Sequence, residues 1–245
     1  TSSVITLSDE AKPVIVSAVT GDNNSDGTVD RLTLTFSESV VITDGDTDND
    51  ITLSASTGSA SITAGSYGAT ASTLVYTISG ATAGNTSLTI DPTYAVSGAG
   101  DITDPTGNEM ANSETVSGSD GSAPILLSAT YKDTNGDGTV NRIDAVYSEA
   151  ITSSAFESSD WTFPANPNGL SVGSGAFSGS TVQITVTGAP ANTTVLGTTT
   201  VKYTNQGSSN SITDGSNSSA TSSVITLSDE AKPVIVSAVT GDNNS

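Results

Sequence analysis

The sequence predicts an all-β protein built from two successive β-sandwich units, and three observations lead to this prediction. Short segments of alternating apolar and polar residues recur along the chain, whereas no long segment has the periodicity of an amphipathic helix. Clusters of Gly, Ser, Asn, Asp and Pro separate these segments and supply turns. The chain also repeats itself, with units of about 110 residues.

The strongest repeat joins the two ends of the chain. Residues 1–25 and 221–245 are identical at all 25 positions, which gives a period of 220 residues. A weaker repeat lies inside this period, because a shift of 111 residues places Pro13 on Pro124 and Glu38 on Glu149. The chain is therefore expected to be one period, plus an overlap, of a longer tandem array.

Three prolines mark the expected boundaries: Pro13, Pro124 and Pro233. Each of these three ends an Asp-x-x-x-Pro segment. Proline favours an extended backbone and cannot donate to a sheet, which suits a linker before a first strand. We expect four parts in chain order: the last strand of a preceding unit (1–9), a first domain (13–119), a second domain (124–229) and the first strand of a following unit (233–245).

In the first unit, the segment 29–37 shows the clearest alternation: Leu32, Leu34 and Phe36 are expected to face inward, opposite Arg31, Thr33 and Thr35. Counting this segment, the expected strands are 13–20, 29–37, 51–54, 59–63, 73–79 and 87–90, with a last one near 114–117.

In the second unit, the matching inward residues are Ile143, Ala145 and Tyr147, and Trp161 with Phe163 is expected in the core. The expected strands are 123–131, 140–147, 159–163, 170–173, 181–187, 199–203 and 224–227. Around seven short strands per unit, with frequent turns, describe tandem immunoglobulin-like β-sandwich domains.

An acidic loop in the second unit has the spacing of a calcium site. It matches the pattern D-x-[DN]-x-[DN]-G, in which oxygen ligands stand at every second position and glycine allows a sharp turn. Asp144 stands at loop position 12, but a strand would point it to the outer face. The expected ligands of this second loop are Asp133, Asn135, Asp137, the Thr139 carbonyl, Asn141 and Asp144.

A similar loop in the first unit has Thr33 at position 12, so its closing ligand must be water or another residue. A polar hairpin that binds nothing is the alternative for both loops. The expected ligands of the first loop are Asp22, Asn24, Asp26, Thr28 and Asp30. The possible closing acids are Asp9, Glu38, Asp120 and Glu149.

Other acidic segments are also candidates for structural or cation-binding roles. The acidic run 44–50 is either a solvated loop or a further cation site. Asp101, Asp104, Asn108 and Asp214 are expected to form turns. A linker acid that bridges through calcium to the next unit's loop would stiffen the joint between units.

Composition weighs against several functions. With 26 acidic and 6 basic side chains, the net charge is −20, which disfavours nucleic acid and anionic membranes as partners. No apolar run is long enough for a membrane span. The chain has neither histidine nor cysteine, and its 4% of aromatic residues offers few sugar platforms. An enzyme is therefore not expected.

Three features resemble the immunoglobulin-like tandem repeats of large bacterial surface adhesins and S-layer proteins: the Pro-led first strand, the acidic loop, and the following "FSE" or "YSE". The loop 133–144 also resembles the calcium loops of dockerins and EF-hands, although those place a helix after the loop. The resemblance implies a secreted, extracellular protein of the cell surface, with Ca²⁺ in an adhesive or scaffolding role.

The expected function is therefore structural: a repeat unit of a calcium-stabilised extracellular fibre, adhesin stalk or surface layer. Its partners would be neighbouring copies of the same repeat, in a covalent array or a filament. The alternative is a calcium-dependent surface module that binds a glycan or a protein.

Overall fold

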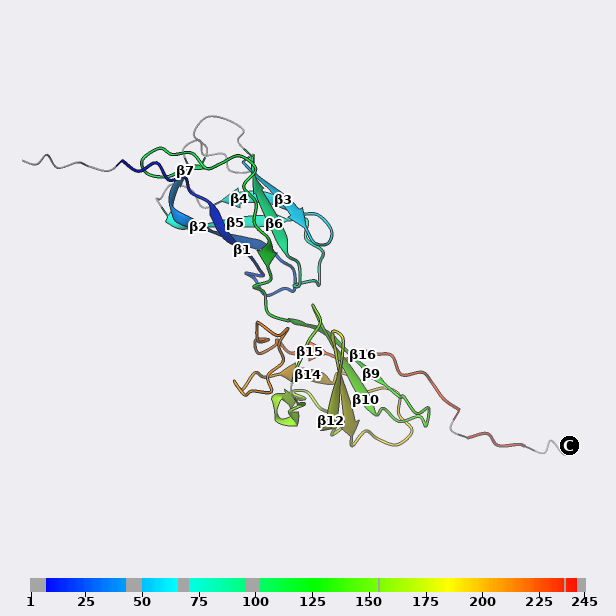
Figure 1. Cartoon of the computed structure of the whole chain (residues 1–245). Helices are drawn as coiled ribbons and strands as arrows, with labels where there is room; N and C mark the ends of the chain where they lie inside the picture. The colour runs from blue at the N-terminus through cyan, green and yellow to red at the C-terminus, as the bar shows by residue number, and fades with distance from the viewer. Residues whose placement is uncertain are drawn as a thin grey trace, which may run out of the picture. The chain divides into compact units, whose positions relative to one another are not determined.

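The chain is an all-β protein of two compact units, Thr1–Ser122 and Ala123–Ser245 (Figure 1). Within the described residues there is no α-helix, only one 3-10 turn, η1 (Ser158–Asp160). The structure is a computed structural model that describes residues 8–42, 50–65, 71–95, 102–153, 155–235 and 237–241.

The first unit contains a large sheet and a small one, an arrangement consistent with a β-sandwich. The large sheet has the order β4-β5-β2-β1-β8, with β7 paired to the end of β2, and the small sheet pairs β3 with β6. The strands are β1 (Ile15–Gly21), β2 (Arg31–Ile42), β3 (Ile51–Ala55), β4 (Ser61–Gly65), β5 (Ala71–Ser79), β6 (Ile90–Tyr94), β7 (Ile102–Thr103) and β8 (Gly118–Ser119).

The second unit repeats this plan. Its large sheet has the order β12-β13-β10-β9-β16, and its small sheet has the order β11-β14-β15. The strands are β9 (Leu126–Lys132), β10 (Arg142–Tyr147), β11 (Trp161–Thr162), β12 (Ser171–Ser178), β13 (Thr181–Thr187), β14 (Thr200–Tyr203), β15 (Ile225–Thr226) and β16 (Ser228–Asp229).

Corresponding strands pair in corresponding ways in the two units. The first strand of each, β1 or β9, runs antiparallel to the next strand and parallel to a short last strand, β8 or β16. A buried tyrosine near the end of each small sheet accepts a hydrogen bond from a backbone N–H: Tyr94 from Ile102 (3.4 Å) and Tyr203 from Ile212 (3.1 Å). The weak internal sequence repeat thus corresponds to a repeated topology.

Alternation along the long hairpin strands builds each core. The predicted inward residues of β2 are buried, with Leu32 and Leu34 at 0% exposure, and those of β10 are buried in the same way. Trp161 is buried in the second core as predicted and lies 5.3 Å from Tyr203 between ring centroids. Burial of one face of each sheet fixes the register, because a slip by one residue would expose the whole apolar set.

Some predicted elements differ from the structure. The segment 87–90 is mostly irregular, and the strand begins only at Ile90 and continues through Pro92. At position 92 proline removes one donor from the strand, but its carbonyl still accepts the Val116 N–H (3.4 Å) from the segment that flanks β6 on its other side. The two-residue strands β7 and β16 were not predicted, because segments this short show no periodicity.

Several predictions fall wholly or partly outside the described residues. Most of the expected strand 1–9, the acidic residues 44–49 and Asp101 lie there. Asp50, at the end of the acidic run, is described and fully buried. In the expected first strand of a following unit, the described residues 233–235 and 237–241 form no strand.

Because each unit has its own core, a core truncation is expected to destabilise its own unit. Leu34→Ala should cost the first unit about 2–5 kcal/mol, and Ile184→Ala should cost the second unit a similar amount. Trp161 is the only tryptophan and lies in the second core, so its fluorescence reports on that unit alone. In denaturant titrations, Leu34→Ala should shift the circular-dichroism transition but not the fluorescence transition. Equal fluorescence shifts in both variants would contradict this.

Candidate metal-binding clusters

Three carboxylates converge at one end of the first unit: Asp9, Glu38 and Asp104, each with an oxygen within 4.8 Å of the others. Asp9 lies in the segment that leads into β1, Glu38 is in β2, and Asp104 follows β7. We call this cluster the acidic triad. It joins three segments that are distant in the sequence, because β2 pairs with both β1 and β7.

The Ser-Glu pair in β2 explains how Glu38 reaches the triad. The Ser37 hydroxyl accepts a hydrogen bond from the Val14 N–H (3.1 Å), and the Ser37 N–H donates to the Val14 carbonyl (2.9 Å). These bonds close the start of the first strand immediately after Pro13. They place the next residue, Glu38, beside the lead-in segment that carries Asp9.

Asp104 is the most firmly held member of the triad. It is 2% exposed, and its carboxylate accepts hydrogen bonds from the backbone and side chains of Thr106 and Asn108. Burial alone would raise the pKa of Asp104, but the bonds from Asn108 and Thr106 lower it to about 2. The prediction that Asp104 forms a turn is therefore confirmed, and the turn holds an ionised carboxylate inside the triad.

Asp9 is held by the same turn. The Asn108 side chain donates to the Asp9 carbonyl (3.1 Å), and the Asp9 carboxylate accepts the Ala11 N–H (3.0 Å). The remaining member, Glu38, has its pKa raised by burial and by the charges of Asp104 and Asp9. An acid held near two fixed negative charges is the group that a bound cation would relieve most.

The second unit has the same residues at the corresponding positions. Glu149 and Asp214 correspond to Glu38 and Asp104, and their carboxylate oxygens lie within 4.8 Å of each other. The Ser148 hydroxyl accepts a hydrogen bond from the Ile125 N–H (2.9 Å), as the Ser37 hydroxyl accepts one from the Val14 N–H. Asp214 forms a turn as predicted, because its carboxylate accepts the N–H groups of Ser216 and Asn217. Burial raises the pKa of Asp214, but the hydrogen bonds from Asn217 and Ser216 outweigh this effect and lower it. In the sequence, Asp120 stands where Asp9 stands.

The first predicted calcium loop is held by hydrogen bonds to its own backbone. Asp22 accepts the N–H groups of Ser25 (2.7 Å) and Gly27 (2.7 Å), and Asp26 accepts that of Thr28 (2.9 Å). Asp30 accepts the N–H of Asn23, so it closes the loop instead of pointing away from it. A carboxylate has about four acceptor sites, so these bonds still leave some for a cation.

The second loop has the same internal bonding. Asp133 accepts the N–H groups of Gly136 and Gly138 (2.8 Å each), and Asp137 accepts that of Thr139 (2.8 Å). Asn141 accepts the Thr134 N–H (3.0 Å), as Asp30 does in the first loop. Neither loop brings three carboxylates together as the triad does, within the part of the chain that the structure describes. Calcium at these loops stays a prediction.

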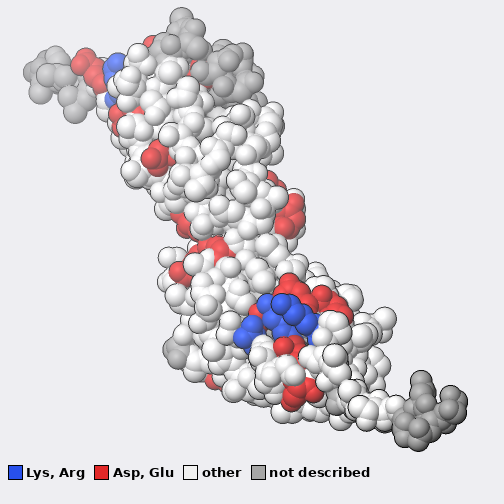
Figure 2. Space-filling view, turned by 90° about the vertical axis from the view of Figure 1, so that its right-hand side faces the viewer, with Lys and Arg blue, Asp and Glu red and all other residues white. Residues whose placement is uncertain are grey.

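Asp144 lies on the outer face of its strand, as predicted, because it alternates with the core residues Ile143 and Ala145. It is nevertheless only 7% exposed, because two basic side chains cover it. Lys132 lies 2.9 Å from one of its oxygens and Arg142 lies 2.7 Å from the other. Lys132 also pairs with Glu230 (2.9 Å). Figure 2 shows Lys and Arg side chains gathered beside acidic ones on the second unit.

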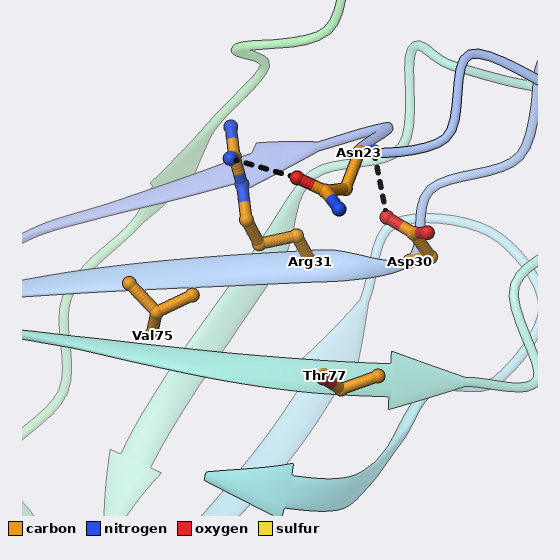
Figure 3. Close-up of a pocket in the computed structure, with 5 residues that line it drawn as sticks. All are labelled: Asn23, Asp30, Arg31, Val75 and Thr77. Carbon is orange, nitrogen blue, oxygen red and sulfur yellow. Dashed lines mark hydrogen bonds between the residues drawn. The ribbon is translucent and has the colours of Figure 1, made fainter. Parts of the chain in front are cut away.

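A shallow pocket lies beside the first loop, on the outer face of β2 and β5 (Figure 3). Arg31 donates to Asn23 across it (3.4 Å), and Asp30, Val75 and Thr77 complete the lining. The Arg31 guanidinium packs over Gly21, where an added Cβ would lie 2.9 Å from Arg31 Nε. The lining offers hydrogen-bonding groups and one pair of opposite charges, Asp30 and Arg31.

No protein-family model, curated protein or solved structure matches this chain. Within the described residues, no helix is long and apolar enough to cross a membrane.

The raised pKa of Glu38 makes the triad sensitive to pH. A carboxyl whose folded-state pKa exceeds the unfolded value of 4.5 stabilises the fold below that value and loses this contribution as pH rises through the folded pKa. Asp104 acts oppositely: its contribution is present above pH 3.8 and is lost as pH falls towards about 2.

Carbon-13 NMR titration of the side-chain carboxyls should therefore show Glu38 titrating above its usual range in chelator. With calcium bound, the pKa of Glu38 should fall, because the cation favours the ionised form. Glu38→Gln identifies the signal by its loss. A Glu38 pKa that calcium leaves unchanged would show that no cation occupies the triad.

Proposed function

We propose that the chain is a structural repeat unit of an extracellular fibre, adhesin stalk or surface layer, in which calcium stabilises the joints between units. The observation that carries the proposal is the acidic triad at the lead-in end of the first unit, whose Glu and Asp recur in the second. We further propose that both units are of the immunoglobulin-like type, which the two-sheet topology supports.

The chemistry of the triad suits a hard divalent cation. Calcium takes six to eight oxygen ligands, and carboxylates can supply one or two each. Three carboxylates within 4.8 Å repel one another, and no basic side chain forms an ion pair with them among the described residues. A cation would therefore replace repulsion with coordination. Water and backbone carbonyls would complete the ligand set.

The position of Asp9 gives the cation a mechanical role. Asp9 precedes Pro13 in the segment that leads into the first unit, whereas Glu38 and Asp104 belong to that unit's own strands and turn. A cation held by all three would fix the lead-in segment to the unit. Because residues 221–229 repeat residues 1–9, the same aspartate recurs as Asp229 at the end of the second unit. Each joint between units of an array would then hold one cation that fixes the lead-in segment to the following unit.

The test is thermal unfolding with calcium, with magnesium and with chelator. A ligand at about 100 times its Kd adds about 2.7 kcal/mol, which for a domain of this size raises Tm by roughly 10 °C or more. Calcium should stabilise the wild-type first unit by this order. Glu38→Gln should remove most of the increment without lowering the Tm measured in chelator, because it relieves repulsion there.

Two further variants separate the triad from its alternatives. Glu114→Gln makes the same charge change outside the triad and should keep the full calcium increment. Asp26→Asn tests the first loop: if it removes the increment and Glu38→Gln does not, calcium acts at the loop and the triad proposal is wrong. An equal increment with magnesium would identify a less selective cation site.

A further inference from the structure

The first unit has an arginine that differs from its counterpart in the second unit by lacking a carboxylate partner. Arg31 and Arg142 are 111 residues apart and begin the equivalent strands β2 and β10. Arg142 contacts the carboxylate of Asp144 through Nε (2.7 Å) and Nη2 (3.0 Å). At the position equivalent to Asp144, the first unit has Thr33. Arg31 therefore forms no such pair, and it has no ion pair among the residues that the structure describes.

The Arg31 guanidinium has donors left for a ligand. Its Nε and Nη2 lie over Gly21, where an added Cβ would be 2.9 Å from each of these atoms. Nε is buried there and has no hydrogen-bond partner. Nη1 donates a long hydrogen bond to the Asn23 side chain (3.4 Å). The end-on edge of the guanidinium, formed by Nη1 and Nη2, can therefore still take a carboxylate.

The pocket around this edge combines polar and apolar groups. It is a cavity of about 230 Å³ on the outer face of β2 and β5 (Figure 3). Beside Arg31, the side chains of Asn23 and Asp30 offer hydrogen-bond acceptors, and Thr77 offers a hydroxyl. Val75, which is 40% exposed, supplies an apolar surface. Pockets for drug-sized ligands measure roughly 300–1,000 Å³, so this smaller one suits a single sugar residue or a smaller group.

We propose that this pocket binds a carboxylated sugar, namely a hexuronate residue of an acidic polysaccharide. The sugar carboxylate pairs with the end-on edge of Arg31, a ring hydroxyl donates to Asp30, and the C–H face of the ring covers Val75. A hexuronate has hydroxyl donors close to its carboxylate, whereas an Asp or Glu side chain has none. Asp30 therefore repels an acidic peptide more strongly than it repels this sugar.

A single sugar residue is expected to bind weakly. The five lining residues include no aromatic ring on which a sugar could stack, and the net charge of −20 opposes an anionic ligand. The small area that one residue covers also leaves little free energy after the entropic cost of association. The dissociation constant for one residue therefore lies in the millimolar range.

The first experiment is a nitrogen-15 NMR titration of the full chain with methyl glucuronide. The amide signals of Asn23 and Thr77 and the Nε–H signal of Arg31 should shift and saturate in the millimolar range. Methyl glucoside has a CH₂OH group in place of the carboxylate, and N-acetylglutamate amide has the carboxylate without the ring. Each should bind at least about tenfold more weakly. Equal binding of either compound, or no saturable shift with methyl glucuronide, overturns the proposal.

The second experiment asks whether Arg31 holds the carboxylate. Arg31→Gln removes the guanidinium, whereas Thr33→Asp installs the carboxylate that Arg142 has in the second unit and so occupies Arg31. Both variants should weaken the binding of methyl glucuronide at least about tenfold. Thr35→Asp is the matched control, because it makes the same charge change on the same face of β2, and it should keep most of the affinity.

The core amide signal of Leu34 should keep its wild-type position in all three variants, which shows that the first unit remains folded. Wild-type affinity in Thr33→Asp overturns the proposal. Equal weakening by Thr33→Asp and Thr35→Asp also overturns it, because general charge repulsion would then explain the loss. All titrations are done in chelator, so their outcome is independent of the calcium proposal, which is measured by the calcium-dependent rise in Tm.

Discussion

Repulsion between carboxylates is the constraint on which the rest of this structure depends. The chain has a net charge of −20 and only 6 basic side chains, so most acids cannot be paired with a cation from the protein. The acidic side chains have three kinds of surroundings in this fold. Loop acids such as Asp22 and Asp133 bind backbone N–H groups, and Asp144 is covered by basic side chains. Among the residues that the structure describes, the acidic triad brings its members together without an ion pair, and this is why we propose it as the site of an external cation.

The two units solve the same problem of anchoring their last strand by different chemistry. In the second unit, Lys132 pairs with Glu230 and so ties the segment after β16 to the end of β9. The equivalent positions of the first unit are glycines, Gly21 and Gly121. A Cβ at Gly121 would lie 2.4 Å from a methyl group of Val19 and 2.7 Å from the Thr20 carbonyl oxygen. The first unit thus has a close backbone approach at Gly121, where the second unit has the ion pair of Glu230.

Much of this fold could be predicted from the sequence, because alternation and turn residues are local signals. The segment 181–187 is a strand with the predicted bounds, and Leu32, Leu34, Ile143 and Ala145 face the cores as predicted. The burial of Asp144 could not be predicted, because the alternation gives the face of a residue and not what covers that face. Lys132 reaches it from the neighbouring strand.

The candidate site was predictable only in part. The sequence indicates Asp9 and Glu38 as possible closing ligands of the acidic loops, but it does not indicate that they lie close to each other. Their approach to Asp104 depends on the pairing of β2 with β1 and β7, and β7 is too short to leave a periodic signal. The sequence did contain one usable hint: Glu38 and Glu149 are equivalent, and each follows a serine whose hydroxyl binds the first residue after a Pro.

The identity of residues 1–25 and 221–245 imposes two requirements on a single sequence. As residues 225–229, the segment must complete the second unit, where Ser228 and Asp229 pair with Thr130 and Tyr131. As residues 9–21, it must supply a triad acid and then the central strand of the first unit. Both requirements can be met because they fall on opposite sides of the Asp-x-x-x-Pro linker, and Asp9, with its repeat Asp229, stands at the division. The aspartate that pairs in the second unit's sheet as Asp229 is thus the repeat of the aspartate that belongs to the first unit's acidic triad as Asp9.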